Sequence, residues 1–226
     1  MPKAIFFDVD GTLVDTNDLH AQAWDEAFRH FGVELPYAAI RGQIGKGGDN
    51  LIPALLPQGL VERRQREIED YRSDLFKREY LQRAKPFPGV RPLFERLRAD
   101  GVRVLLASSS HAEEIDHYRD LLDIRELVDA TTSKDDVNHS KPDPDIFRAA
   151  LSKVAPLGPA EVLVVGDTPY DVEAAGKLGI RTIGVRCGGF PDAELLRAGA
   201  CALYDGPADL LERYDTSPLA RKARQG

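Results

Sequence analysis

Two aspartates separated by one residue, Asp8 and Asp10, are the first side chains in this sequence whose types and spacing suggest chemistry. They follow the apolar run 4–7, and Gly11 and Thr12 come next. Because side chains alternate along a strand, both carboxylates would leave one face of a continuing strand, whereas glycine lets the backbone turn. Open α/β sheets bind ligands at the carboxyl ends of their strands. Neighbouring carboxylates repel each other unless a cation or shared proton compensates them, so the pattern predicts metal-assisted chemistry.

Three further polar clusters follow an apolar run or precede a helical pattern. They are Ser108-Ser109-Ser110 after residues 102–107, Lys141 within the segment 140–145, and Gly166-Asp167 with Asp171 after residues 162–165. A parallel sheet brings the carboxyl ends of its strands to one edge, so we expect all four clusters to converge there. Singly, each cluster has an ordinary explanation as a helix cap or an exposed loop position. Four such coincidences in this order explain the pattern less well than a single site does.

The converging groups fit phosphoryl transfer. A carboxylate can attack phosphorus and form an aspartyl-phosphate, which divides one difficult displacement into two steps. Mg²⁺, a hard cation that prefers oxygen ligands, would balance the acids and screen the nucleophile from the phosphate. A lysine binds phosphate as a point charge, and hydroxyls and turn amides donate hydrogen bonds to it. A second carboxylate can protonate the leaving oxygen and then activate the hydrolytic water.

The elements that must position these groups alternate between strands and helices. Strands are predicted by the apolar runs at residues 5–7, 102–107, 127–131, 162–165, 182–185 and 201–204. Apolar positions spaced three and four apart predict helices between them, as in residues 144–155 and 171–178. This alternation predicts an α/β fold with a Rossmann-like parallel sheet and helices on both of its faces.

One region, residues 17–85, contains no convincing strand. An apolar helical stripe in it ends at Gly32, and the segment 60–85 carries many charges, which we interpret as the solvated face of a packed helix. We therefore predict an all-helical cap domain at residues 16–86, inserted into a core domain made of residues 1–15 and 87–215, with hinges near Asp15-Thr16 and Pro86-Phe87. The polar, basic tail at residues 216–226 is expected to be loosely ordered from about Asp215 onward.

Composition excludes several classes of partner. A formal net charge of -7 over 226 residues argues against nucleic acid or an anionic membrane as the main partner. The two cysteines, Cys187 and Cys201, form neither a metal-type cluster nor a disulfide framework. There is no N-terminal apolar signal and no apolar run near the length of a membrane span. We expect a cytoplasmic protein that acts on a small phosphorylated metabolite, as a monomer or a homodimer.

The four motifs together resemble those of the haloacid dehalogenase superfamily of phosphohydrolases, in the subfamily whose helical cap follows the first motif. The resemblance covers nearly the whole chain, from Ile5 to about Tyr214. It is carried by Asp8-Val-Asp10-Gly-Thr12, by Ser108 after an apolar strand, by Lys141 within Ser-Lys-Pro-Asp-Pro-Asp-Ile-Phe, and by Gly166-Asp167 with Asp171.

The resemblance implies a role for each matching residue. Asp8 would be the nucleophile and Asp10 the general acid and base. The Mg²⁺ ligands would be Asp8, Asp10 through its main-chain carbonyl, and Asp167, with Asp171 helping directly or through water. The phosphate-binding residues would be Ser108, Ser109 and Lys141, with Thr12 fixing the first loop. The dehalogenases that name the family lack an acid at the position of Asp10, so its presence favours phosphate esters over carbon-halogen bonds.

The cap is expected to choose the substrate. Residues 41–49 resemble the cap loop that descends onto the active site in similar proteins, so Lys46 and Arg41 are candidate specificity residues. A flexible exposed lysine is an equally good interpretation of Lys46. His20 resembles a histidine that couples cap closure to Asp10 in some capped relatives, although an ordinary helix-face histidine explains it equally well.

The sequence therefore predicts a Mg²⁺-dependent phosphatase that hydrolyses a small phosphomonoester, of the phosphoglycolate or sugar phosphate type, through an aspartyl-phosphate on Asp8. A phosphomutase of the β-phosphoglucomutase type is the alternative among enzymes. A non-catalytic binding module is the alternative outside enzymes, and the presence of the complete set of acids and the lysine argues against it. The identity of the substrate stays open.

Overall fold

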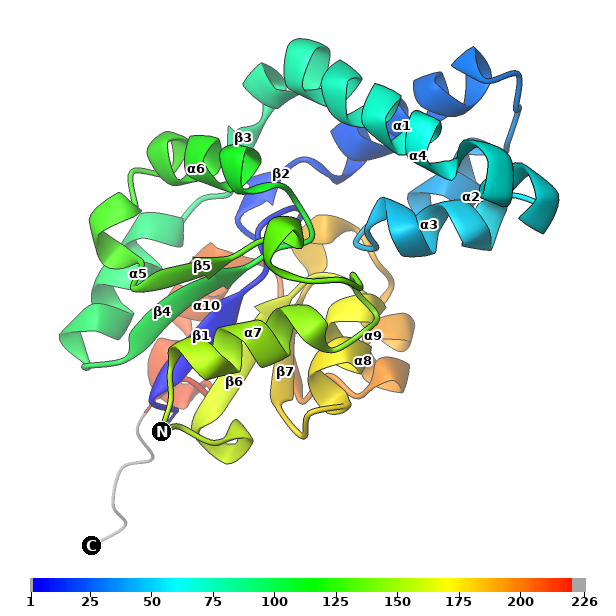
Figure 1. Ribbon diagram of the computed structural model, residues 1–226. Helices are drawn as coiled ribbons and strands as arrows, with labels where there is room; N and C mark the ends of the chain where they lie inside the picture. Colours follow the sequence, from blue (N-terminus) through cyan, green and yellow to red (C-terminus); the bar gives the residue numbers. More distant parts are fainter. Residues whose placement is uncertain (1, 221–226) are drawn as a thin grey trace, which may run out of the picture.

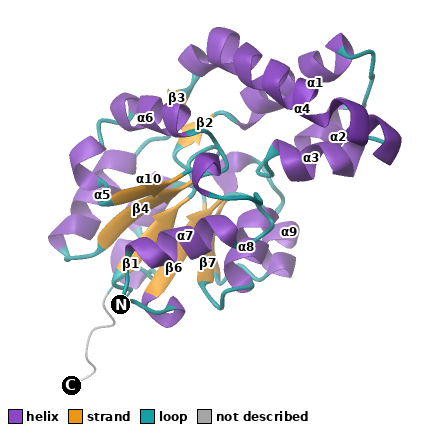
Figure 2. Cartoon of the chain, in the orientation of Figure 1, coloured by secondary structure: helices purple, strands orange, loops and turns teal. Residues whose placement is uncertain are grey.

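The computed structural model describes residues 2–220, and its centre is a six-stranded parallel sheet (Figures 1 and 2). The strands are β1 (Ala4–Phe7), β4 (Arg103–Ala107), β5 (Ala130–Thr132), β6 (Val162–Gly166), β7 (Arg181–Val185) and β8 (Ala202–Tyr204). Their order across the sheet is β5-β4-β1-β6-β7-β8, so β1 lies in the middle with β4 and β6 on either side. The predicted α/β fold is confirmed.

Helices cover both faces of the sheet (Figure 2). They are α5 (Val90–Ala99), α6 (Ala112–Leu121), α7 (Asp145–Lys153), α8 (Pro169–Gly176), α9 (Asp192–Ala198) and α10 (Pro207–Glu212). Single 3₁₀ turns occur at Leu81–Arg83, Arg125–Leu127, Lys134–Asp136, Pro159–Glu161, Arg186–Gly188 and Tyr214–Thr216.

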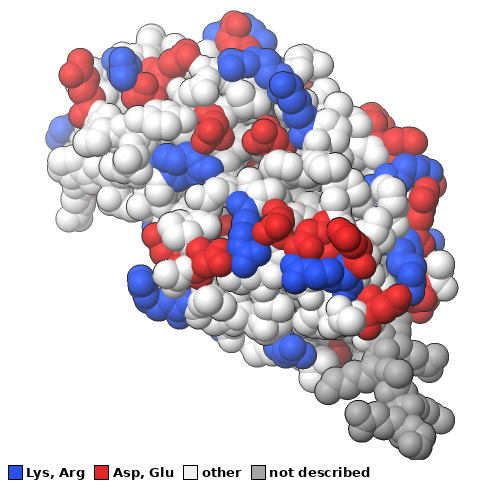
Figure 3. All heavy atoms as spheres, turned by 180° about the vertical axis from the view of Figure 1, so that it is seen from behind, with Lys and Arg blue, Asp and Glu red and all other residues white. Residues whose placement is uncertain are grey.

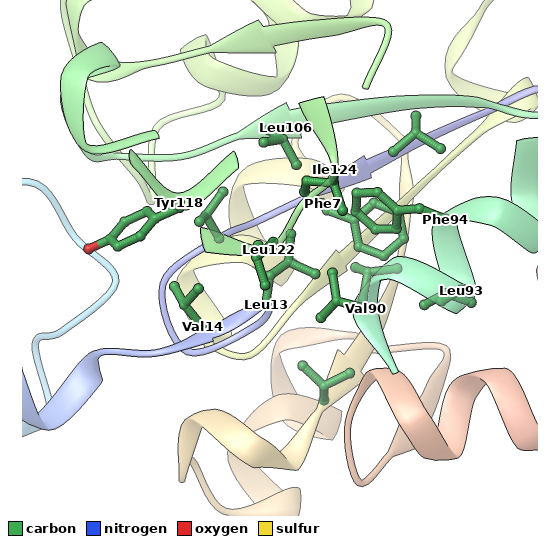
Figure 4. Close-up of a cluster of buried hydrophobic side chains, with 14 of the residues drawn as sticks. Phe7, Leu13, Val14, Val90, Leu93, Phe94, Leu106, Tyr118, Leu122 and Ile124 are labelled. Carbon is green, nitrogen blue, oxygen red and sulfur yellow. The ribbon is translucent and has the colours of Figure 1, made fainter. Parts of the chain in front are cut away.

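The alternation of side chains along β1 explains why this strand is apolar throughout. Ile5 and Phe7 face the cluster that contains residues of α5, α6 and α10, whereas Phe6 faces the cluster formed with α7 and α8. Figure 4 shows the first cluster around Phe7, whose ring centroid lies 4.7 Å from that of Phe94. A strand buried on both faces needs apolar residues at every position, which removes the polar alternation of a half-exposed strand.

Four helices form a second body beside the sheet edge, drawn in blue to cyan in Figure 1. They are α1 (Asn17–His30), α2 (Tyr37–Arg41), α3 (Gly48–Leu55) and α4 (Gln58–Leu75), and α4 continues into a π-helical turn at Phe76–Tyr80. We call this body the cap. It has a small core of its own, with fully buried Phe28, Ile40, Leu51 and Ile68.

Two short strands connect the cap to the rest of the chain. They are β2 (Val14–Asp15) and β3 (Lys85–Pro86), and they pair in antiparallel fashion. The predicted crossings near Asp15-Thr16 and Pro86-Phe87 therefore lie at the ends of a two-stranded ribbon, which the sequence analysis did not anticipate. The ribbon brings the entry and exit of the cap next to each other.

Strand β5 begins three residues later than predicted. The carboxylate of Asp129 accepts a hydrogen bond from the main-chain N–H of Val104 (2.8 Å), and the register of the ladder starts one residue later at Ala130. Leu127, where the prediction placed the first strand residue, ends a 3₁₀ turn instead. The N–H of Asp129 also donates to the carbonyl of Val104 (2.8 Å), so Asp129 joins β4 through both its main chain and its side chain just before the ladder.

The expectation of a loose tail from Asp215 is wrong for residues 215–220. Leu219 is 0% exposed and belongs to the main core cluster. The hydroxyl of Ser217 holds this turn, because it donates to the carbonyl of Tyr214 (2.7 Å) and accepts from the N–H of Leu219 (3.1 Å). One apolar side chain is enough to dock a polar segment. Residues 221–226 lie outside the described part of the chain.

Acidic and basic side chains are interspersed over the face shown in Figure 3. Among the described residues, many acidic and basic side chains form ion pairs, such as Arg186 with Asp192 and with Asp205, both at 2.8 Å. Within residues 2–220, none of the helices combines the length and the hydropathy that crossing a bilayer requires.

The docking of the tail can be tested with two leucines of opposite exposure. Leu219→Ala should lower the free energy of unfolding by about 2–5 kcal/mol, because it removes a fully buried side chain. The control Leu196→Ala removes a side chain of a residue that is 54% exposed and should change stability by less than about 0.5 kcal/mol. Urea unfolding followed by circular dichroism measures both variants. Equal effects of the two substitutions would show that the tail is not docked.

Candidate active site

The carboxyl ends of β1, β4 and β6 carry the predicted polar clusters to one place. Asp8 follows β1, Ser108 follows β4, and Asp167 follows β6. Lys141 comes from the loop before α7, and its Nζ contacts Asp8 Oδ1 and lies 2.7 Å from Asp171 Oδ1. The structure therefore brings together residues from all four motifs. Their juxtaposition follows from the parallel order of the strands.

Asp8 and Lys141 form the centre of the site. Both are almost fully buried, with residue exposures of 5% and 1%. Burial raises the pKa of Asp8 well above its usual value, which Lys141 opposes and the neighbouring acids reinforce. Burial would lower the pKa of Lys141, but the carboxylates of Asp171 and Asp8 outweigh it and raise that pKa. Lys141 therefore keeps its charge and lies between two acids.

Three carboxylates gather within the reach of one cation. One oxygen each from Asp8, Asp167 and Asp171 lie within 4.8 Å of one another. Burial, and next the charge of Asp171, raise the pKa of Asp167 to about 7. An all-oxygen donor set with unbalanced negative charge is what Mg²⁺ binds. The residues present thus fit the expected metal, although the Asp10 carboxylate is not a member of this group.

Neutral donors hold the metal-side acids in place. Thr12 Oγ1 is 3.0 Å from Asp167 Oδ1 and 3.3 Å from Asp8 Oδ2. Asn17 Nδ2 donates to Asp167 Oδ2 (2.7 Å). Gly11 has a φ of 78°, and a Cβ there would lie 2.2 Å from Asn17 Nδ2, so glycine is required by both conformation and space. Thr12 thus fixes the first loop against two acids, and Asn17 is a contributor that the sequence analysis missed.

The carboxylate of Asp10 turns to the other side, toward the cap. It accepts hydrogen bonds from Thr16 Oγ1 (2.7 Å) and Ser110 Oγ (2.7 Å), and His20 Nε2 lies 2.8 Å away. Burial alone would raise the pKa of Asp10, but His20 and these hydroxyls outweigh it and hold the pKa well below its usual value. Of the two interpretations that the sequence left open for His20, the structure shows the contact with Asp10, which joins the cap to the core.

The three serines that follow β4 make different contacts. Ser108 is fully buried, and its Oγ is 3.4 Å from Asp10 Oδ2 and accepts from the N–H of Ser110 (3.0 Å). Ser109 Oγ is buried without a hydrogen-bond partner among the described residues, and Ser109 lines the pocket above Asp8. An unpartnered hydroxyl at a pocket wall is free to donate to a ligand. Ser110, which the sequence analysis left without a role, is the stronger partner of Asp10.

A pocket lies between the cap and the core, directly above Asp8 and Asp10. Its lining includes Lys46 from the cap loop and residues of α4, and on the core side Ser109, Ser110, His111 and Lys134. Lys46 Nζ donates to Gln43 Oε1 (2.6 Å) and lies 4.6 Å from the ring centroid of Tyr170. The candidate position of Lys46 at the pocket is thus observed.

Arg41 lies elsewhere and does not line this pocket. Its Nε donates to Asp18 Oδ1 (2.6 Å), and its Nη2 donates to the carbonyl of Gly188 (2.5 Å). The same carbonyl accepts from Asn17 Nδ2 (2.9 Å). Arg41 therefore connects the cap to the core instead of facing a substrate, which corrects its assignment as a candidate specificity residue.

The interpretation of every charge in residues 60–85 as solvated is wrong for two residues. Glu69 and Arg72 line the pocket together with Ser73, at the three-and-four spacing that places them on one face of α4. The Arg72 guanidinium contacts Nδ1 of His20, and because it can only donate, Nε2 is left to donate to Asp10. The number of charges in this segment gave no signal for either residue. The spacing of four residues from Ile68 to Arg72 was an available signal, and it did not extend to Glu69.

Comparisons with known proteins agree with this geometry. The family model described as haloacid dehalogenase-like hydrolase matches residues 2–179. The phosphoglycolate phosphatase of Cereibacter sphaeroides is 31% identical over 94% of this chain and 99% of its own length. The phosphorylated carbohydrates phosphatase of Thermotoga maritima is 29% identical over 92% and 96%, respectively.

Solved structures show the same arrangement of sheet and cap. A candidate β-phosphoglucomutase from Bacteroides vulgatus superposes with a TM-score of 0.83 at 25% identity, covering 95% of this chain and 88% of the other. The family match covers well over half of the sequence, and the motifs that carried the predicted resemblance meet in one site. The chain therefore belongs to the haloacid dehalogenase-like hydrolase family.

Proposed function

We propose that the protein is a Mg²⁺-dependent phosphatase that hydrolyses a small phosphomonoester through an aspartyl-phosphate on Asp8. The observation that carries this proposal is the environment of the Asp8 carboxylate. Lys141 binds one of its oxygens, Thr12 lies 3.3 Å from the other, and both Asp8 and Asp10 line the pocket. A carboxylate held at the floor of a pocket beside a lysine is placed to attack a phosphoryl group that the same lysine binds.

In the first step an oxygen of Asp8 forms a bond to phosphorus, and the bond between phosphorus and the leaving oxygen breaks. Asp10 gives its proton to that oxygen. In the second step water attacks phosphorus, Asp10 takes the proton of the water, and Asp8 is released with inorganic phosphate. The low pKa of Asp10 keeps it ionised, as a base must be before it takes a proton, and an approaching phosphate dianion would raise that pKa toward the range in which Asp10 can carry and return a proton.

Asp8, Asp167 and Asp171 would hold the metal, together with the main-chain carbonyl of Asp10. When bound, Mg²⁺ would neutralise the acids and draw charge from the phosphoryl oxygens. Lys141 and Ser109 would bind the remaining phosphoryl oxygens, since one is a buried ammonium and the other an unpartnered hydroxyl. Ser108 would orient Asp10 through its hydrogen bonds.

The leaving group would occupy the part of the pocket on the side of Asp10. Apart from Asp8 and Asp10, the charged residues that line this pocket are Lys46, Arg72 and Lys134, opposed by Glu69. This excess of cations beyond the two catalytic acids favours a leaving group that carries a carboxylate or several hydroxyls. The similarity to phosphatases named for phosphoglycolate and for phosphorylated carbohydrates supports the same two substrate types. The proposal includes residues 16–86 moving as one cap, and a cytoplasmic monomer or homodimer as the active form.

A phosphomutase is the second candidate, favoured by the superposition on the candidate β-phosphoglucomutase. A mutase would return the phosphoryl group from Asp8 to a bound intermediate instead of water. Net release of phosphate from several monoesters would support the phosphatase. Activation by a sugar bisphosphate without net phosphate release would support the mutase.

The nucleophile is tested by Asp8→Asn, which keeps the size of the side chain and removes its nucleophilicity. We expect kcat on p-nitrophenyl phosphate to fall by on the order of 10⁴-fold or more, because the residues of a catalytic unit act together. The exposed Asp15→Asn is the matched control and should retain full activity. Retained activity in Asp8→Asn, with both variants melting normally, would remove Asp8 as the nucleophile.

The metal is tested by removal and by its effect on stability. EDTA should abolish hydrolysis and excess Mg²⁺ should restore it. Mg²⁺ should also raise the melting temperature of the protein, because it binds the folded state and relieves repulsion among the three acids. Asp167→Asn should lose most of that rise. Indifference of both activity and melting temperature to EDTA and Mg²⁺ would contradict the metal site.

The leaving-group side is tested by Lys46→Ala. We expect kcat/KM for 2-phosphoglycolate to fall about tenfold, the size of one lost charge-assisted hydrogen bond, and kcat/KM for p-nitrophenyl phosphate to change much less. Lys77→Ala is the matched control, since Lys77 also joins cap and core, through Glu113 at 2.7 Å, but does not line the pocket. An equal loss of Lys46→Ala on both substrates would argue against a specificity role.

A further inference from the structure

The residue that precedes the phosphate-side lysine is held by the cap. The N–H of Ser140 donates to Asp49 Oδ2 (2.9 Å), and its hydroxyl donates to Asp49 Oδ1. The same hydroxyl accepts from the N–H of Gly47 (2.9 Å), and the carbonyl of Ser140 accepts from Asn50 Nδ2 (2.8 Å). Every polar atom of Ser140 is thus bonded to the cap. We call Gly47, Asp49 and Asn50 the Ser140 clamp.

The clamp is closely fitted. Ser140 is only 3% exposed, and a Cβ at Gly47 would lie 2.5 Å from its hydroxyl oxygen. Both oxygens of the Asp49 carboxylate accept from Ser140, which makes the contact charge-assisted and fixes its orientation. Glycine at position 47 lets the cap backbone come this near. A looser contact between two surfaces would leave some of these groups to water.

The clamp acts next to the most constrained side chain of the site. Lys141 follows Ser140 directly, is 1% exposed, and contacts Asp8 and Asp171. Residues 137–144 form neither helix nor strand, and within this described stretch the main-chain restraint is a turn bond from the N–H of Asp143 to the carbonyl of Ser140 (3.0 Å). The bonds to Ser140 from the cap are therefore a major restraint on where the Lys141 ammonium points. A displacement of about 1 Å at such a group can cost on the order of a hundredfold in rate.

We propose that Asp49 is a positioning residue that couples closure of the cap to the placement of Lys141 against Asp8. This inference rests on the proposed phosphatase function and adds a regulation of the same site. When the cap opens, Ser140 loses four hydrogen bonds, and the loop that carries Lys141 loosens. A substrate that lets the cap close assembles the phosphate-binding lysine in the same movement. Closure then promotes chemistry only when the pocket is correctly filled.

The test compares Asp49→Asn with Glu113→Gln. Asp49→Asn is isosteric, removes the charge and leaves Ser140 a single acceptor oxygen. Glu113→Gln weakens the Lys77–Glu113 ion pair, which is a contact between cap and core away from the pocket. We measure kcat and KM on p-nitrophenyl phosphate and the inhibition constant of inorganic phosphate, which needs Lys141 but has no leaving group. Asp49→Asn should lower kcat and weaken phosphate inhibition, each about tenfold. Glu113→Gln should leave both within about twofold of wild type.

A second variant and a second readout keep the result interpretable. Ser140→Ala removes the hydroxyl but keeps the main-chain bonds, so it should give a smaller loss in the same direction. Hydrogen exchange of residues 137–144 should be faster in Asp49→Asn than in wild type, because the N–H and the hydroxyl of Ser140 then share one acceptor oxygen in place of two. Unchanged kcat, phosphate inhibition and exchange in a folded Asp49→Asn would overturn the coupling and leave the phosphatase function standing. A wild-type protein that hydrolyses no phosphomonoester would overturn both.

Discussion

Repulsion among buried carboxylates is the constraint on which the rest of the structure depends. Four of them meet at one sheet edge: Asp8, Asp10, Asp167 and Asp171. Burying charges is costly unless they are paired, so each needs a partner. Lys141 serves two of them, and its own burial is tolerated only because those acids surround it. Burial, and next the charge of Asp171, raise the pKa of Asp167, and a divalent cation bound by these acids would compensate their charge.

The cap takes part in this compensation as well as covering the pocket. His20 and Thr16 come from the cap and its entry, and both bind the carboxylate of Asp10. Arg72 then contacts the second ring nitrogen of His20 from α4. The groups that lower the pKa of Asp10 therefore include His20 of the cap and Thr16 at its entry. If the cap moves, a closed cap would complete the environment of Asp10 only around a bound ligand.

The sequence predicted the centre of the site better than its walls. Asp8 and Lys141 could be placed together because parallel strand ends share an edge, so topology alone brings distant motifs into contact. Glu69 and Arg72 could not, because a charge on an amphipathic helix looks the same whether it faces water or a partner domain. Leu219 was missed for a related reason, since a single apolar side chain in a polar tail has no periodicity. The burial of these residues could not be predicted, because it depends on tertiary packing, which the local sequence pattern does not contain.

The contacts between cap and core lie on both flanks of the nucleophile. On one flank, Asp49 binds the residue before Lys141. On the other, Arg41 binds the carbonyl of Gly188, which also accepts from Asn17, the donor that holds Asp167. In this structure the cap thus contacts the loop that carries Lys141 and the side of Asp167 together, through the side chains of Asp49, Arg41 and Asn17. Because both flanks must dock at once, a ligand that holds the cap even slightly open would leave one half of the site imperfectly placed, and the fold could reject it without any direct clash.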